Sequence, residues 1–182
     1  MHRLTTTDIS RSALFAALIA GGAFVAIPLG PVPFTLQVFA VLLAGMLLGP
    51  RLGALSVVAY LVVGLVAPVY AGGASGLGAL LGPTGGYLIA FIPAVVITGI
   101  VSARGEPSSR RFILAGILGL LPIYAIGATW LALQLGLSAR AALTAGVVPF
   151  VAFDGVKALL AAAVARSLVS LPLGLPATQR DR

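Results

Sequence analysis

The sequence contains no cysteine, only one histidine, His2, and few charged residues of either sign. Without cysteine, the chain can form neither a disulfide framework nor a thiolate metal site. A lone histidine excludes imidazole clusters and argues against a metal-dependent or histidine-assisted enzyme. The sequence also lacks a GxxxxGK[ST] motif, so this chain does not hydrolyse ATP through a P-loop. We therefore expect no enzyme, no metal and no cofactor, and favour binding or transport.

Charged residues make up 8% of the 182 residues, whereas 60% are hydrophobic. A soluble domain averages about 25% charged residues, so lipid is expected to surround most of this chain. The formal net charge of +7 would also suit a nucleic-acid-binding protein. However, the arginines stand singly between apolar runs rather than in one patch, so no nucleic-acid partner is expected.

Six apolar runs approach the length of about 17–25 residues that a membrane-spanning helix needs. They cover residues 12–27, 34–49, 53–70, 86–102, 112–136 and 146–170. Pro93, Pro122 and Pro149 interrupt the helical ladder, which neighbouring helices can tolerate in a membrane. The sequence therefore predicts an all-α membrane bundle of six helices, formed as one domain over residues 1–182.

The first run could instead be a signal peptide, because Arg3 and Arg11 precede it and small residues at 21–26 resemble a cleavage site. Later runs have the same hydropathy, so a retained helix is the favoured interpretation.

Arginines in the short connections predict the orientation of the bundle. One side would carry Arg3, Arg11, Arg51, Arg104, Arg110, Arg111, Arg166, Arg180 and Arg182, and the other side only Arg140. Because positive residues favour the cytoplasm, both termini are predicted to be cytoplasmic. We expect a multi-pass protein of the bacterial cell (inner) membrane.

Polar residues in the apolar runs are predicted to meet at one depth, near the outer face. Asp154 and Lys157 are spaced i, i+3 and so share one helix face in the outer half of the last run. Four other polar residues fall at the same level, namely Thr35, Gln37, Thr84 and Tyr87. The uncharged, glycine-rich connection 71–86 lies on that side too. Charges inside a membrane usually face the bundle interior and mark a functional site.

Purely structural roles are the alternative for each of these residues. Asp154 and Lys157 could be an ion pair that fixes helix register. Thr35 and Gln37 could cap a helix or join two helices, and Tyr87 could be an interfacial anchor. The site hypothesis depends on their shared depth, not on any single residue.

Small residues recur every four positions in the first run, at Ala13, Ala17 and Gly21 and at Ala16 and Ala20. This spacing allows another helix to approach closely. The helix could belong to this bundle or to a partner.

Three motifs closely resemble the BioY family, the substrate-binding membrane components of energy-coupling-factor (ECF) biotin transporters. They are "GPVPFTLQVFAVLLAG" (30–45), "GPTGGYLIAF" (82–91) and "PFVAFDGVK" (149–157), in that order. The resemblance covers essentially the whole chain. It implies a six-helix bundle with biotin bound near the outer face, beneath the connection between the first two spans.

The resemblance also implies roles for individual residues. Asp154 and Lys157 match the family's DxxK motif and are expected to bind biotin. Tyr87 and Thr84, both in the GPTGGY motif, and Gly73 are expected near the ligand. Gln37 and Thr35 belong to the first motif, where they either touch the ligand or brace the loop.

Partners are implied as well. Similar components dock on a membrane coupling protein driven by two ATPase subunits, through an AxxxA face that Ala13 and Ala17 match. Some members are reported to act without the ATPase module. Two other functions remain open: binding of another small vitamin on the same bundle, and a non-transport membrane scaffold in which the Asp154–Lys157 pair is structural.

Overall fold

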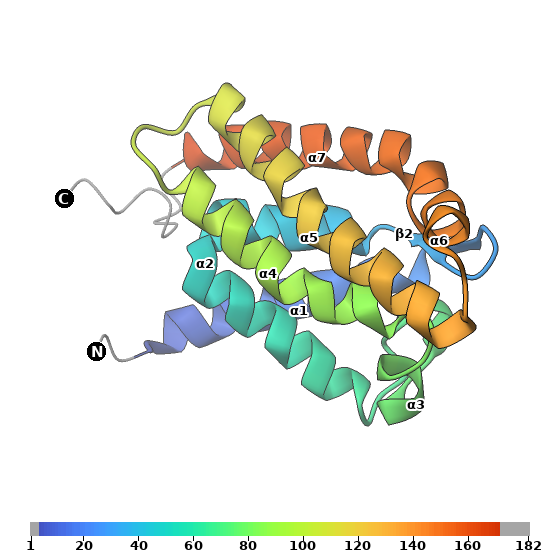
Figure 1. The fold of residues 1–182 in the computed structure, drawn as a ribbon. Coiled ribbons are helices and arrows are strands. Elements are labelled where there is room, and N and C mark those ends of the chain that lie inside the picture. Colours follow the sequence, from blue (N-terminus) through green and yellow to red (C-terminus); the bar gives the residue numbers. More distant parts are fainter. Residues whose placement is uncertain (1–3, 172–182) are drawn as a thin grey trace.

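A computed structural model describes residues 4–171, which are mostly helical (Figure 1). This range leaves out His2 and three of the arginines that were used to predict the orientation, namely Arg3, Arg180 and Arg182. Four described helices are long and apolar enough to cross a membrane: Gln37–Gly64, Gly85–Ser102, Ser109–Leu135 and Val148–Val169. The prediction of a helical membrane protein is thus confirmed, whereas the count of six spans does not follow from the helix assignment.

The first helix, α1 (Thr6–Phe24), begins earlier and ends earlier than the predicted span 12–27. It begins at Thr6 because Thr5 and Asp8 form a capping box that satisfies the first backbone N–H groups. It ends before Pro28, which cannot continue a helix. Residues Ala26–Pro28 instead form β1, which pairs antiparallel with β2 (Pro33–Thr35). This short ribbon was not expected in an all-α fold.

The next helix, α2 (Gln37–Gly64), combines the two predicted spans 34–49 and 53–70. Its two segments meet at Gly49, whose φ of 76° and ψ of −176° are accessible essentially to glycine alone. The chain reverses direction there (Figure 1). A Cβ on Gly99 would collide with Pro50, so the break also packs closely against α4. The second segment stops at Gly64, six residues before the predicted end.

The helices that follow agree more closely with the predicted spans. α4 (Gly85–Ser102) and α5 (Ser109–Leu135) contain Pro93 and Pro122 inside the helix, as predicted. α7 (Val148–Val169) has Pro149 in its first turn. The expectation that Pro149 interrupts the ladder is therefore wrong, because the first-turn N–H groups have no intrahelical acceptor.

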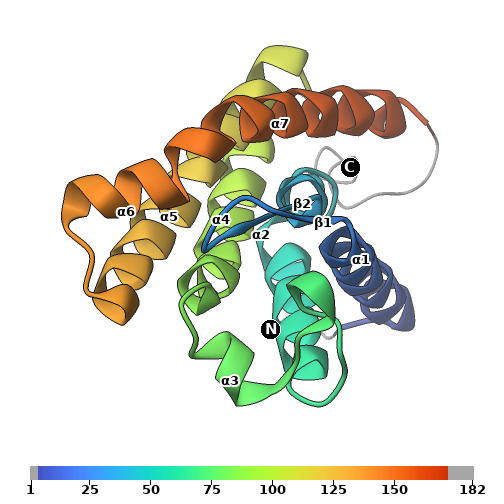
Figure 2. The ribbon, with the colours of Figure 1, turned by 90° about the vertical axis from the view of Figure 1, so that its right-hand side faces the viewer.

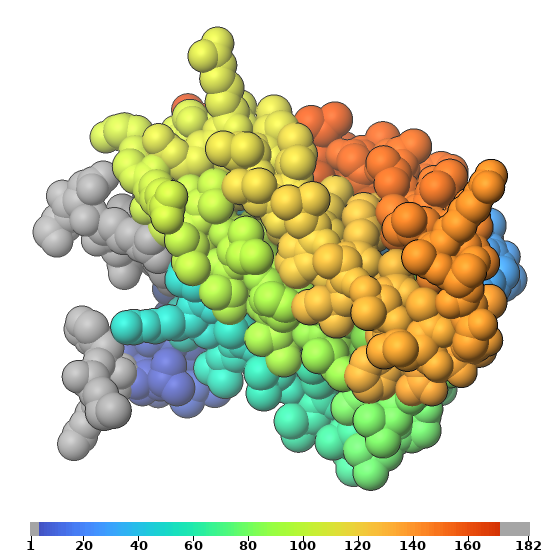
Figure 3. Space-filling view, in the orientation of Figure 1, coloured from blue at the N-terminus to red at the C-terminus, as the bar shows by residue number. Residues whose placement is uncertain are grey.

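Short elements cover one end of the bundle. The connection after α2 contains a 3-10 turn, η1 (Ala71–Gly73), and α3 (Gly76–Leu80), and α6 (Ala139–Gly146) precedes α7. Seen from that end, the β1–β2 ribbon crosses the middle, with α6 to its left and α3 below it (Figure 2). The side chains of α3, α5 and α6 form much of the same end in the space-filling view (Figure 3). The start of α1 and the end of α7 lie at the opposite end (Figure 1).

The core is centred on α4, which packs against both α2 and α5, while α7 packs against α2 and α5. Buried side chains such as Met46, Phe112 and Ile123 fill the space between these helices. Large apolar residues on the outer faces of α5 and α7 are exposed, as expected of surfaces in contact with lipid.

Candidate functional site

A cavity opens at the end of the bundle covered by the ribbon, α3 and α6. The empty space there is about 760 Å³, including the open space at its mouth, and apolar and polar side chains line it together, as in small-molecule sites. The walls come from the ribbon and the start of α2, the connection 70–79, the start of α4, the middle of α5 and the start of α7. Segments that are distant in the sequence thus line one cavity.

A buried ion pair lies in the wall of this cavity. Lys157 Nζ donates to Asp154 Oδ1 over 2.7 Å, and the two residues are only 5% and 3% exposed. Their i, i+3 spacing on α7 places both on one helix face. A single buried charge would be very costly here, so the pair presents two opposite charges at nearly zero net charge.

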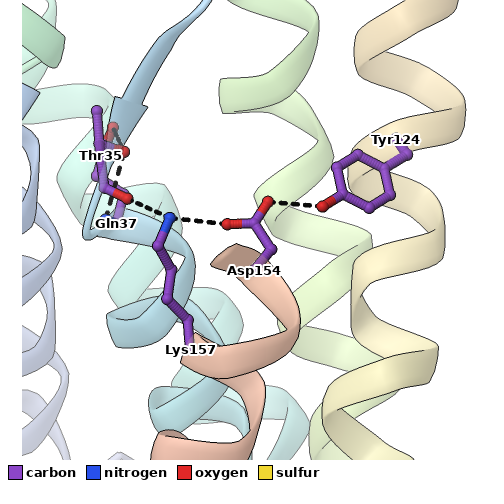
Figure 4. A network of polar contacts seen from close by, with 5 residues as sticks. All are labelled: Thr35, Gln37, Tyr124, Asp154 and Lys157. Atoms are coloured by element: carbon purple, nitrogen blue, oxygen red, sulfur yellow. Dashed lines mark hydrogen bonds and ion pairs between the residues drawn. The ribbon is translucent and has the colours of Figure 1, made fainter. Parts of the chain in front are cut away.

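Residues of two other elements, α5 and β2, complete the coordination of the pair (Figure 4). Tyr124 Oη on α5 donates to Asp154 Oδ2 over 2.7 Å. Lys157 Nζ also donates to the backbone carbonyl of Thr35 over 2.6 Å, and it lies 3.8 Å from the centre of the Phe34 ring. Both oxygens of the carboxylate and the ammonium are therefore held in place, which pre-organises the site.

Gln37 and Thr35 form the next layer of the network. Thr35 Oγ1 donates to Gln37 Oε1 over 3.1 Å, and the Gln37 backbone N–H donates to Thr35 Oγ1 over 3.4 Å. Gln37 Nε2 donates to Tyr60 Oη over 2.6 Å. The bracing role left open from the sequence is therefore present, and both residues also line the cavity.

Tyr87 and Thr84 line the cavity from the start of α4. Tyr87 is 9% exposed, and its Oη donates to the carbonyl of Gly146 over 2.8 Å. An anchor in the membrane interface would be more exposed, so the tyrosine instead fixes α4 to the end of α6. Gly73 does not line the cavity, although Ala71 and Ala74 beside it do.

Several cavity residues were not singled out from the sequence. The most consequential is Tyr124, which holds the carboxylate of Asp154. A phenol in the middle of an apolar span was the available signal. Tyr70 also lines the cavity, and its Oη donates to the carbonyl of Leu61 over 2.7 Å. The apolar lining comes from Val32, Val38, Leu88, Phe91, Ile123 and Phe150.

This arrangement suits a compact, largely apolar guest with a few hydrogen-bonding groups. The apolar lining would bury its body, while the paired charges and hydroxyl groups would orient its polar ends. Charge-assisted hydrogen bonds from such groups are the stronger kind.

A second, shallow groove lies on the outside of the bundle between α1 and α2. Its lining includes Ala13 and Ala17, which are exposed, and also Ala16 and Ala20. Ala59, Tyr60 and Val63 form the α2 wall. The small residues of α1 therefore do not simply pack inside this bundle, and a groove remains beside them.

Fold and geometry together define a helical membrane protein with a polar-lined cavity near one end of its bundle. The family model of BioY matches residues 1–172. The chain belongs to the BioY family, as its motifs predicted.

Named relatives and a solved structure agree with this assignment. A protein from Pyrococcus horikoshii named "Probable biotin transporter BioY" is 46% identical over 162 residues, which cover 88% of this chain and 95% of the relative. The "Biotin transporter BioY" of Thermotoga maritima is 42% identical, covering 90% and 96%. The crystal structure of the S-component for biotin from an ECF-type ABC transporter superposes with a TM-score of 0.84 at 31% identity, covering 93% of this chain and 96% of that one.

The ion pair leads to a prediction about stability. Lys157→Met leaves the buried Asp154 carboxylate without its cation, so it should lower the free energy of unfolding by about 3–5 kcal/mol. Adding Asp154→Asn should restore most of this loss, because no uncompensated charge remains. Thermal unfolding of the ligand-free protein in detergent measures both effects. Arg166→Met, at an exposed position of the same helix, is the matched control and should change little. A double variant no more stable than Lys157→Met would contradict the interpretation.

Proposed function

We propose that this chain captures biotin at the outer face of a cell membrane and mediates its uptake as the substrate-binding component of an ECF transporter. The observation that carries the proposal is the buried Asp154–Lys157 pair in the wall of a small-molecule cavity. The names of the chain's relatives, and the biotin S-component among its structural neighbours, support biotin as the ligand.

The chemistry of biotin matches the lining of the cavity. Its fused rings are apolar, its ureido group offers two N–H donors and a carbonyl, and its valerate ends in a carboxylate. Asp154 can accept hydrogen bonds from ureido N–H groups, and Lys157 can donate to the ureido oxygen or to the valerate. Tyr87, Thr84, Gln37 and Thr35 supply further hydrogen-bonding groups around the same space.

We further propose that the chain is a single membrane domain with six spans, counting the two segments of α2 separately. The connection from α4 to α5 lies at the end of the bundle that contains the start of α1 (Figure 1), and the sequence places Arg104, Arg110 and Arg111 in or beside this connection. This end would face the cytoplasm, since positive residues favour that side. The cavity would then open on the outer side, and both termini would be cytoplasmic in a bacterial inner membrane or its equivalent.

The groove on α1 would receive a partner. We propose that an ECF membrane coupling protein, carrying two ATPase subunits, packs a helix against Ala13 and Ala17. Small side chains allow helix backbones to approach closely in lipid. The absence of a P-loop from this sequence is consistent with energy supplied by such a partner.

Biotin binding provides the first test of the proposed function. The purified chain, titrated calorimetrically against a panel of vitamins without nucleotide, should bind biotin in preference to the others. Asp154→Asn and Lys157→Ala should each weaken biotin binding by about a hundredfold or more, because each removes a buried charged contact. Arg104→Ala, at an exposed position distant from the cavity, is the control and should bind like the wild type. Preference for another vitamin, or full affinity in both site variants, would contradict the proposal.

Docking provides a second, separate test. Ala13→Leu should block the groove toward its cytoplasmic end and so abolish co-purification with the coupling protein and most biotin uptake by cells. Biotin affinity of the isolated variant should stay within about twofold of wild type, because Ala13 does not line the cavity. Ala163→Leu, which adds the same bulk at an exposed position on α7, is the matched control. Intact co-purification of Ala13→Leu would contradict the docking assignment.

A further inference from the structure

Tyr60 is deeply buried but does not line the ligand cavity. It is 1% exposed, lies in the second segment of α2, and contributes to the groove beside α1. Its Oη accepts a 2.6 Å hydrogen bond from Gln37 Nε2, and its ring meets the Tyr70 ring edge-to-face at 5.6 Å. Both Gln37 and Tyr70 line the cavity. Tyr60 thus contacts two cavity-lining residues without lining the cavity itself.

The Gln37 amide is held at both ends. Nε2 is bonded to Tyr60 Oη, while Oε1 accepts from Thr35 Oγ1. Thr35 in turn uses its backbone carbonyl to accept from Lys157 Nζ. One continuous series of hydrogen bonds therefore runs from Tyr60 through Gln37 and Thr35 to the ammonium of Lys157.

We infer that Tyr60 is a positioning residue for ligand binding, an inference that rests on the proposed function. Its hydroxyl fixes the orientation of the Gln37 amide at the start of α2 and thereby the adjoining end of β2, where the Thr35 carbonyl helps to hold Lys157. Tyr60 itself stays out of reach of the ligand, because it is absent from the cavity wall. Its effect on affinity is transmitted through Gln37.

Tyr60→Phe isolates this effect, since the ring and its contact with Tyr70 remain while the hydroxyl is removed. Gln37 Nε2 then lies buried without its partner, and the amide must be ordered again whenever ligand binds. We expect biotin affinity to fall about tenfold, corresponding to roughly one lost buried hydrogen bond. The free amide should also accelerate dissociation more than it slows association.

The experiment titrates biotin into four proteins in detergent: wild type, Tyr60→Phe, Gln37→Leu and the double variant. Because Tyr60 acts through Gln37, Tyr60→Phe should weaken binding in the wild-type background but cause no further loss in the Gln37→Leu background. Thr98→Val is the matched control. Its buried hydroxyl donates to backbone carbonyls of α4 and α5 and lies outside the cavity lining, so its loss should lower thermal stability without changing affinity.

Two results would overturn the inference. Tyr60→Phe could bind biotin as tightly as wild type while unfolding at a lower temperature, which would make Tyr60 purely structural. Alternatively, Tyr60→Phe could weaken binding equally in both backgrounds, which would mean that it does not act through Gln37. Failure of the wild-type chain to bind biotin is a distinct result, because it contradicts the proposed function itself.

Discussion

The rest of the site depends on the need to stabilise two opposite charges inside an apolar bundle. Asp154 and Lys157 are compensated by each other, by a phenol on α5 and by a backbone carbonyl at the end of β2. Each partner comes from a different segment, so satisfying the pair brings α7, α5 and the β2–α2 junction together. Within residues 4–171, the Ser102 hydroxyl is the one buried side-chain polar atom without a hydrogen bond. The chain therefore pairs the polar groups that its apolar surroundings do not solvate.

The same geometry keeps the site ready for a ligand. Lys157 is fixed by Asp154, by Thr35 and by the face of Phe34, and Phe34 packs in turn against Phe153 of α7 with ring centres 5.4 Å apart. The ribbon is consequently part of the site as well as its cover. A ligand that enters meets charges already oriented, so less side-chain ordering is needed on binding. The break at Gly49 contributes to this geometry indirectly. It divides α2 into two shorter helical segments in place of one long helix.

The sequence was informative where the polar residues are rare. Asp154 and Lys157 could be found because charges are scarce in lipid-spanning runs, and Thr35, Gln37, Thr84 and Tyr87 because they share their depth. The partners Tyr60 and Tyr124 could not be found in this way, since they join the site through hydrogen bonds between residues 23 and 30 positions apart. Helix ends were missed where local chemistry overrides hydropathy, at the Thr5–Asp8 capping box and at Gly49. Short helices such as α3 and α6 are too brief to produce a clear hydropathy signal.

The most direct measurement of the central claim is a structure of this chain determined with biotin bound in a lipid nanodisc. The account predicts biotin within the cavity, with polar atoms at hydrogen-bonding distance from both Asp154 and Lys157 and with its rings against the apolar wall. Biotin seated elsewhere on the bundle, or an α7 pair that turns toward lipid when biotin binds, would contradict it.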